Sequence, residues 1–270
     1  MSAAETRVSV AGLGAVGREL VRHLSDGIDG LALVAVSAAD HDKATRTLSQ
    51  LGANVPVLAL EDLEPVSDLV VECIPASLVP QLTESVVSAG KEIVMLTAGV
   101  LLTHPELVDL AERHGGRITV PTGALLGLDA VGAAAEGAIH SVKMISRKPP
   151  QGLAGAPHLE RSGIDAGEVT EPTLAFSGSA REAAEGFPAN LNIAAALALA
   201  GIGPELTQVE MWIDPTVTRN THRVEVRSEA ADFTLTIANV PSENPRTGRI
   251  TALSVLRLLR KRAGALAVGT

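Results

Sequence analysis

A chain of 270 residues is long enough for two modest domains, and its 46% apolar content and net charge of −9 are typical of an acidic globular protein. The single cysteine, Cys73, excludes an internal disulfide and any multi-cysteine metal site, and the absence of tyrosine excludes a Tyr-Lys catalytic pair. An aromatic content of 1% and the negative charge argue against binding to nucleic acid.

The sequence shows no targeting or membrane segment. Its longest apolar stretch, Ile193 to Ile202, is about half of the roughly 20 residues that a membrane span needs. The polar residues before the first apolar run lack the three-part pattern of a signal peptide. We therefore expect a cytoplasmic protein that binds no membrane.

The first half of the chain alternates short apolar runs with segments of helical periodicity. The runs are apolar on both faces, as buried parallel strands are. Strands are expected at 8–11, 31–36, 69–71, 93–96 and 118–120, and helices at 15–24, 40–51, 76–89 and 105–114. This order predicts an α/β fold with a Rossmann-type parallel sheet covered by helices.

A glycine-rich loop joins the first strand to the first helix. Its sequence, GLGAVG at 12–17, matches the dinucleotide-binding pattern G-x-G-x-x-G. The first glycine permits a tight turn, the second lets the backbone approach a pyrophosphate, and the third allows close packing of the helix. Five residues are therefore predicted to bind NAD or NADP: Gly12, Gly14, Ala15, Val16 and Gly17.

The end of the second strand leaves the choice between NAD and NADP open. An acidic side chain there would favour NAD and an arginine NADP. Ser37 is neither, Asp40 comes slightly late, and Lys43 or Arg46 could fold back.

After Pro121 the pattern changes to more strands and fewer helices. Strands are expected at 139–145, 209–213, 222–226 and 233–237, helices at 128–137 and 192–200, and an exposed loop or flap at 152–167. This predicts a second α+β domain with a mixed or antiparallel sheet. The helix expected at 247–263 should return to the first domain. The predicted domains are 1–121 with 241–270, for the dinucleotide, and 122–240, for substrate, catalysis and dimerisation.

His222 lies at a change from polar to apolar residues on one face of an expected strand. Strand alternation places Asn220 and His222 on the same face as Val224 and Val226. Such a histidine is either part of a pocket or a hydrogen-bonded core residue, and the alternation does not decide between them.

Several polar motifs of the second half occur in a distinctive order. They are PTGA at 121–124, GLD at 127–129, SRKPP at 146–150, FPANLN at 187–192, DPTVTRNTH at 214–222, and NVP at 239–241 followed by Asn244, Pro245 and Thr247. With the glycine loop, these motifs make the chain resemble the L-aspartate dehydrogenase family. Thr122 replaces a serine that is frequent in the family, and Leu96 to Gly99 depart from its usual Ser-Val-Gly.

The resemblance implies a homodimeric enzyme that oxidises L-aspartate with NAD or NADP. The product, iminoaspartate, hydrolyses to oxaloacetate and ammonia or feeds quinolinate and NAD synthesis. Carried over by motif, Ala124 and Asn190 contact the cofactor and His222 is the active-site residue. An imidazole can take a proton from the substrate ammonium or activate water against the imine, and the sequence does not say which.

Aspartate carries two carboxylates, so a binding site needs a fixed cation or N–H donors. Lys148, which precedes two prolines, is the candidate cation, and Asn220 is the second candidate substrate residue. No spacing of histidines and carboxylates suggests a metal site. The competing hypotheses are a two-domain reductase of the dihydrodipicolinate reductase or homoserine dehydrogenase type, and a dinucleotide sensor without turnover.

Overall fold

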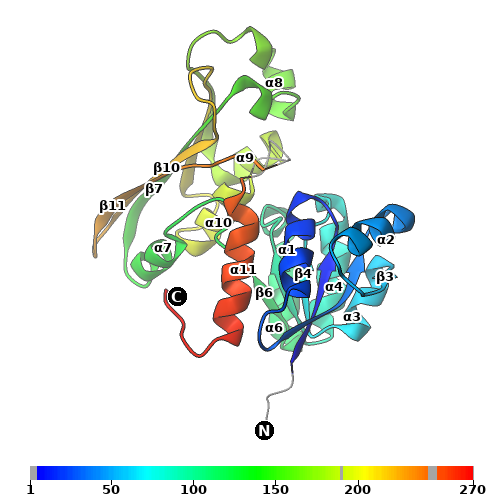
Figure 1. Cartoon of the computed structure of the whole chain (residues 1–270). Coiled ribbons are helices and arrows are strands. Elements are labelled where there is room, and N and C mark those ends of the chain that lie inside the picture. The colour runs from blue at the N-terminus through cyan, green and yellow to red at the C-terminus, as the bar shows by residue number, and fades with distance from the viewer. Residues whose placement is uncertain (1–4, 189–190, 243–247, 270) are drawn as a thin grey trace. The chain divides into compact units, whose positions relative to one another are not determined.

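The computed structural model describes residues 5–188, 191–242 and 248–269 (Figure 1). The chain divides into two units, Met1–Pro121 with Ala252–Thr270 and Thr122–Thr251. No helix among the residues described is long and apolar enough to cross a membrane.

The first unit contains the predicted parallel sheet. Its strands are β1 (Thr6–Ala11), β2 (Leu31–Ser37), β3 (Val57–Leu58), β4 (Leu69–Glu72), β5 (Glu92–Met95) and β6 (Arg117–Thr119). They are ordered β3-β2-β1-β4-β5-β6, and every pair is parallel. The order reverses between β1 and β4, which is where doubly wound folds of this type bind their ligands. The prediction of a Rossmann-type sheet is confirmed.

Helices cover both faces of this sheet. They are α1 (Ala15–Ser25), α2 (His41–Gln50), α3 (Leu63–Val66), α4 (Val79–Ser88), α5 (Val100–Thr103), α6 (Glu106–His114) and α11 (Ile250–Ala263). Leu20 of α1 and Val255 of α11 pack against Val10 in one core cluster. Val86 of α4 and Ala111 of α6 pack with Val70 on the other face. Burial of both faces explains why the strands are continuously apolar.

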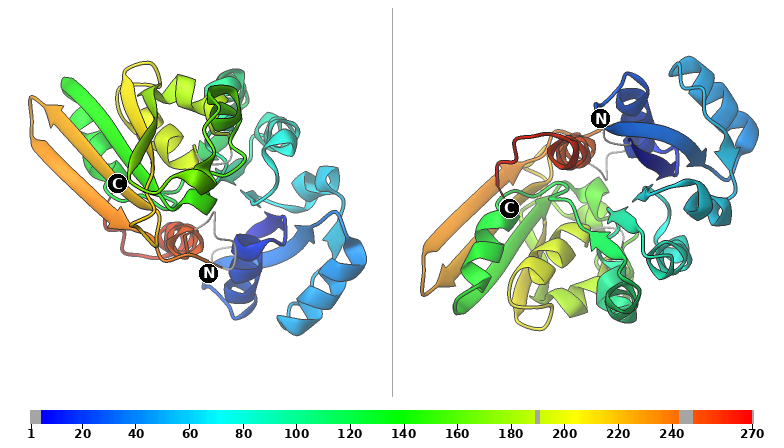
Figure 2. Two further views of the ribbon diagram at one scale, coloured as in Figure 1. Left: turned by 90° about the horizontal axis from the view of Figure 1, so that it is seen from above. Right: turned by 90° about the horizontal axis from the view of Figure 1, so that it is seen from below.

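The second unit contains a five-stranded mixed sheet, which confirms the second part of the predicted fold. Its strands are β7 (Ile139–Lys148), β8 (Thr173–Ser179), β9 (Thr207–Ile213), β10 (Thr221–Ser228) and β11 (Asp232–Ala238), in the order β11-β10-β7-β9-β8. β7 and β9 are parallel and the other pairs antiparallel. In both views of Figure 2 the long strands β7 (green) and β10 and β11 (orange) lie side by side.

The described residues of the second unit form the helices α7 (Leu128–Ala135), α8 (Pro157–Ser162), α9 (Ala180–Gly186) and α10 (Asn192–Ala200). The alanine-rich α10 contacts α7, α9 and β9. The strand β8 and the helix α9 were not predicted. Residues of β8 are mostly half-exposed, so the strand shows little contrast between its two faces.

The segment 152–167 differs from the exposed loop or flap predicted for it. It contains α8, which begins with Pro157 and ends at Gly163 in the left-handed conformation. Leu153, Ala156, Leu159 and Ala166 are buried. The apolar side chains that alternate with glycine and charge in this segment therefore anchor it to the unit.

The segment before α11 also differs from expectation. The units divide at Ala252, whereas the predicted return to the first domain begins at 241. Pro241 forms an isolated antiparallel bridge with Gly248, and the Arg249 amide donates to the Val240 carbonyl at 2.8 Å. These hydrogen bonds keep residues 248–251 with the second unit.

Candidate active site

The glycine loop of the first unit is shaped by contacts that only glycine allows. Gly12 has a φ of +100°, and a Cβ there would lie 2.4 Å from the Cys73 carbonyl oxygen. A Cβ on Gly17 would lie 1.9 Å from the Gly12 carbonyl oxygen. Both glycines are therefore required by close packing.

Gly14 is different, because a Cβ there would meet no atom within 4 Å. It precedes α1, whose first intrahelical bond runs from the Arg18 amide to the Gly14 carbonyl at 3.0 Å. The earlier amides of the helix, including those of Ala15 and Val16, are thus directed at the open end of α1, where phosphates are favoured. The loop fits a dinucleotide pyrophosphate.

The end of β2 carries no acidic side chain aligned with the strand. Ser37 is buried, and its carbonyl accepts the Gly12 amide at 2.7 Å. Asp40 caps α2, with its Oδ1 accepting from the Lys43 amide at 2.9 Å. The acidic residue nearest the end of β2, Asp40, therefore caps the N-terminus of α2 with its carboxylate.

In the second unit, His222 lies on the buried face of the sheet opposite Ser146. β10 and β7 are paired in this register, and the Ser146 Oγ is 3.0 Å from His222 Nδ1. Lys148 lies two residues further along β7 on the same face. The three residues are 2%, 1% and 3% exposed for His222, Ser146 and Lys148 respectively. His222, Val224 and Val226 are all buried on the same face of β10, as the alternation of the strand predicts.

Burial controls the charge of both basic groups. Burial, and to a smaller extent the positive charge of Lys148, lowers the pKa of His222 to about 3. Burial lowers the pKa of Lys148 to about 8. At neutral pH the imidazole is therefore uncharged and a weak base, while the lysine retains most of its charge.

Lys148 and Asn220 approach each other beside Gly152. A Cβ on Gly152 would lie 3.3 Å from Lys148 Cβ and 3.5 Å from Asn220 Oδ1. Asn220 directly precedes β10, two residues before His222, and Lys148 is the last residue of β7. The fold thus gathers the predicted catalytic residue and both predicted substrate residues at one end of two paired strands.

The predicted cofactor contacts of the second unit are only partly described. The Ala124 carbonyl accepts from Asn239 Nδ2 at 2.9 Å, and the Asn239 amide donates to the Asn220 carbonyl at 2.8 Å. Asn239, which sequence reasoning did not single out as a site residue, therefore links Ala124 to Asn220. Asn190 lies outside the described residues.

The opposite face of this sheet carries a separate set of charged residues. Arg147 pairs with Asp214 at 3.0 Å, and its guanidinium carbon lies 4.7 Å from the centroid of the Trp212 ring. Arg147 precedes Lys148, so strand alternation directs it away from the face of His222.

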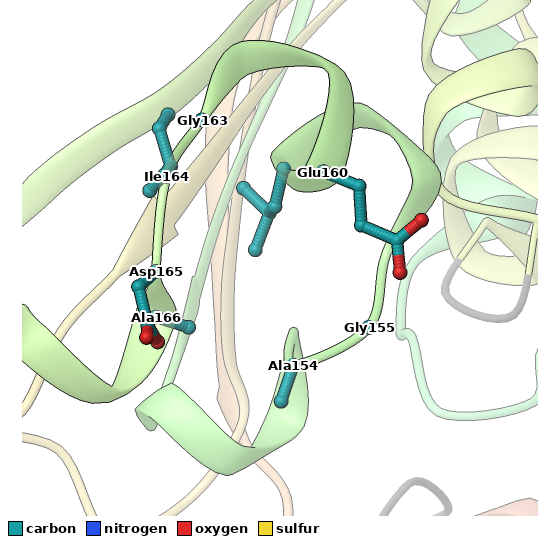
Figure 3. Close-up of a pocket in the computed structure, with 8 residues that line it drawn as sticks. Ala154, Gly155, Glu160, Gly163, Ile164, Asp165 and Ala166 are labelled. Atoms are coloured by element: carbon teal, nitrogen blue, oxygen red, sulfur yellow. The ribbon is translucent and has the colours of Figure 1, made fainter.

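A pocket of about 350 Å³ lies within the segment that holds α8 (Figure 3). It is lined by Ala154, Gly155, Leu159, Glu160, Gly163, Ile164, Asp165 and Ala166. None of the predicted site residues that the structure describes lines it. Among the described residues, no three His, Cys, Asp or Glu side chains form a group that could hold a metal ion.

A buried acid of the first unit was missed by the sequence reading. Glu72 ends β4 and is fully buried, with its carboxylate among the turns that follow β4 and β5. The signal was present in the sequence, because a glutamate directly follows the apolar run at 69–71.

Comparison with known proteins agrees with both units. The family model for the C-terminal region of aspartate dehydrogenase matches residues 129–262. The model for the NAD-binding domain of homoserine dehydrogenase matches residues 12–121, which identifies the first unit as a nicotinamide dinucleotide-binding domain.

Relatives match along the whole chain. L-Aspartate dehydrogenase 3 of Bordetella bronchiseptica is 54% identical, covering 98% of each chain, and L-aspartate dehydrogenase of Bradyrhizobium diazoefficiens is 52% identical, covering 100% of this chain and 96% of the relative. The crystal structure of aspartate dehydrogenase from Thermotoga maritima has the same fold, with a TM-score of 0.73 at 20% identity, covering 98% of this chain and all of that one. The chain therefore belongs to the L-aspartate dehydrogenase family.

Proposed function

We propose that the protein oxidises L-aspartate with NAD or NADP and water to oxaloacetate, ammonium, the reduced dinucleotide and a proton. The observation that carries the proposal is the buried, uncharged His222 beside Ser146 and Lys148 in a chain of this family. The bound dinucleotide supplies the hydride acceptor for the substrate α-carbon. Every other step falls to residues of the chain.

In this proposal Lys148 and Asn220 hold the substrate carboxylates. The buried ammonium of Lys148 forms a strong charge-assisted hydrogen bond when a substrate carboxylate reaches it. The carboxylates of the bound substrate offset the burial that lowers the pKa of Lys148, so the substrate restores the full charge of the lysine.

His222 is the proton acceptor. A neutral imidazole can deprotonate the substrate ammonium before hydride transfer or activate the water that attacks the imine, and the proton that it accepts is later released to solvent. Burial and Lys148 keep the imidazole uncharged before the substrate binds, but they also lower its basicity, so this role depends on a substrate that raises the pKa of His222. The two carboxylates of a bound substrate stabilise the imidazolium that proton transfer produces.

Four broader expectations belong to the proposal. The protein works in the cytoplasm without binding nucleic acid, in line with the net charge of −9, and the imine product can enter pyridine nucleotide biosynthesis. It forms a homodimer, and the half-buried Trp212, Arg147 and Glu210 on the sheet face opposite His222 support an interface there. Light scattering during size-exclusion chromatography tests the dimer, and a monomeric mass contradicts it.

Absorbance of the reduced nicotinamide tests the reaction. The protein is assayed with L-aspartate, with homoserine, and in reverse with oxaloacetate and ammonia, each with both dinucleotides. Turnover of aspartate in preference to homoserine supports the proposal. Homoserine is the second substrate because residues 12–121 match the NAD-binding domain of homoserine dehydrogenase. A preference for homoserine contradicts the proposal. Binding of dinucleotide without turnover of any substrate indicates a sensor.

A further inference from the structure

Glu72 occupies the point at which the strand order of the parallel sheet reverses. It is the last residue of β4, where it pairs with Ala11 of β1 and Met95 of β5. The reversal between β1 and β4 places it at the carboxyl edge where such sheets receive their ligands. A fully buried carboxylate at this place is costly and calls for a reason.

The Glu72 carboxylate accepts four hydrogen bonds. Oε1 accepts from the Ile74 amide at 2.9 Å and from Thr97 Oγ1 at 3.0 Å. Oε2 accepts from the Leu96 amide at 3.0 Å and from the Thr97 amide at 2.8 Å. One side chain therefore ties together the two turns that follow β4 and β5.

The turn after β4 also packs against the glycine loop. The position that a Cβ would occupy on Gly12 lies 2.4 Å from the Cys73 carbonyl oxygen and 3.3 Å from Ile74 Cγ2. The Cys73 amide also donates to the Ala11 carbonyl at 2.8 Å. A shift of the backbone at Cys73 and Ile74 would therefore reach Gly12 directly.

Glu92 provides a comparison within the same sheet. It is also buried, accepts from Thr119 Oγ1 at 2.7 Å and pairs with Arg262 of α11. However, it begins β5 and so lies at the amino edge, opposite the edge that receives ligands. Its contacts support strands and a helix, whereas those of Glu72 hold turns at the ligand edge.

We propose that Glu72 is a positioning residue that holds the turns after β4 and β5, and through Cys73 and Ile74 the glycine loop, in the conformation that receives the dinucleotide. The inference rests on the proposed dinucleotide function of the first unit. Glu72 acts by ordering the backbone before binding, so its removal lowers dinucleotide affinity without touching the chemistry of the substrate.

Glu72→Gln is the sharpest perturbation, because it conserves shape. The amides of Leu96 and Thr97 can only donate, so the remaining carbonyl oxygen of glutamine is needed at their side. The new NH₂ group then faces the Ile74 amide, which is also a donor. The substitution thus releases the turn after β4, the one that contacts Gly12.

The experiment is calorimetric titration of NADH and of NADPH, without substrate, into the wild type, Glu72→Gln and Glu92→Gln, together with thermal unfolding of each. We expect Glu72→Gln to raise the dissociation constant about tenfold, which corresponds to about 1.4 kcal/mol. Glu92→Gln should lower the unfolding temperature but keep the dissociation constant within twofold. In steady-state assays Glu72→Gln should raise KM for the dinucleotide and leave KM for aspartate unchanged.

An unchanged dissociation constant in Glu72→Gln overturns the proposal, and so does an equal loss of affinity in Glu92→Gln. If Glu72→Gln does not fold, Thr97→Val removes the one hydroxyl donor and keeps all three backbone donors. It should weaken NADH binding about fivefold, and unaltered binding would refute the role of Glu72. A wild type that binds NADH but does not oxidise aspartate contradicts the proposed reaction alone.

Discussion

Replacing Lys148 by methionine should stabilise the protein while weakening substrate binding. Burial lowers the pKa of Lys148 from its ordinary value of 10.5 to about 8, so the folded state disfavours the ammonium. The difference between these values corresponds to about 3 kcal/mol at neutral pH, where the lysine is charged in both the folded and the unfolded chain. Methionine fills a similar volume without a charge.

The free energy of unfolding of Lys148→Met should therefore exceed that of the wild type by about 3 kcal/mol at pH 7, measured by denaturant unfolding. Between pH 8 and 10.5 the unfolded wild type binds more protons than the folded protein, so its stability rises with pH. The advantage of the variant should shrink over this range and vanish above it.

Function should change in the opposite direction. Loss of a charge-assisted bond to a substrate carboxylate costs about 1.5 to 3 kcal/mol, which predicts a rise of about 10- to 100-fold in KM for aspartate. KM for the dinucleotide should not change. Steady-state rates with each substrate varied in turn measure both constants.

Lys143→Met is the matched control in the same strand. Lys143 pairs with Glu210 at 2.7 Å and its side chain is 41% exposed. Its replacement should alter the unfolding free energy by less than about 1 kcal/mol and leave both KM values unchanged. The reasoning is refuted if Lys148→Met is no more stable than the wild type at pH 7, or if its advantage is the same at pH 7 and pH 10.

Three further predictions concern His222 of the second unit and the glycine loop of the first unit. His222→Ala should lower turnover by about 10²- to 10⁴-fold and leave NADH affinity within twofold, and unchanged turnover would remove His222 from the mechanism. The pKa of His222 is about 3 in the folded protein and 6.5 in the unfolded chain, so the unfolded chain binds a proton first as the pH falls. The free energy of unfolding of the wild type should therefore decrease by about 5 kcal/mol between pH 6.5 and pH 3. His222→Gln should lack this loss in acid denaturant titrations, and an equal loss in both proteins would contradict the assignment. Gly17→Ala should lower both thermal stability and NADH affinity, because the new methyl group meets the Gly12 carbonyl, whereas Gly14→Ala should keep the stability and lower only the affinity. Normal NADH binding by Gly14→Ala would show that the loop does not approach the pyrophosphate.

Features that depend on local sequence patterns could be predicted from the sequence. Continuous apolar runs identify β1, β2, β4, β5 and β6 because both faces of that sheet are covered by helices, whereas the two-residue strand β3 was not predicted. The inward side of His222 follows from alternation along β10. The helix α9 could also have been found, since Ser179 and Glu182 form a capping box that is legible in the sequence.

Tertiary structure alone decided which polar groups meet. Ser146 and His222 are 76 residues apart, and Asn239 and Ala124 are 115 apart, yet each pair is joined by a hydrogen bond. The four donors to Glu72 come from two turns separated by more than twenty residues. Periodicity reports which face of an element is buried, but the register between strands and the path of the turns depend on packing across the whole sheet. Local sequence patterns were therefore enough to predict the fold class and the glycine loop. The charge states of His222 and Lys148, by contrast, arise only from the burial that folding imposes.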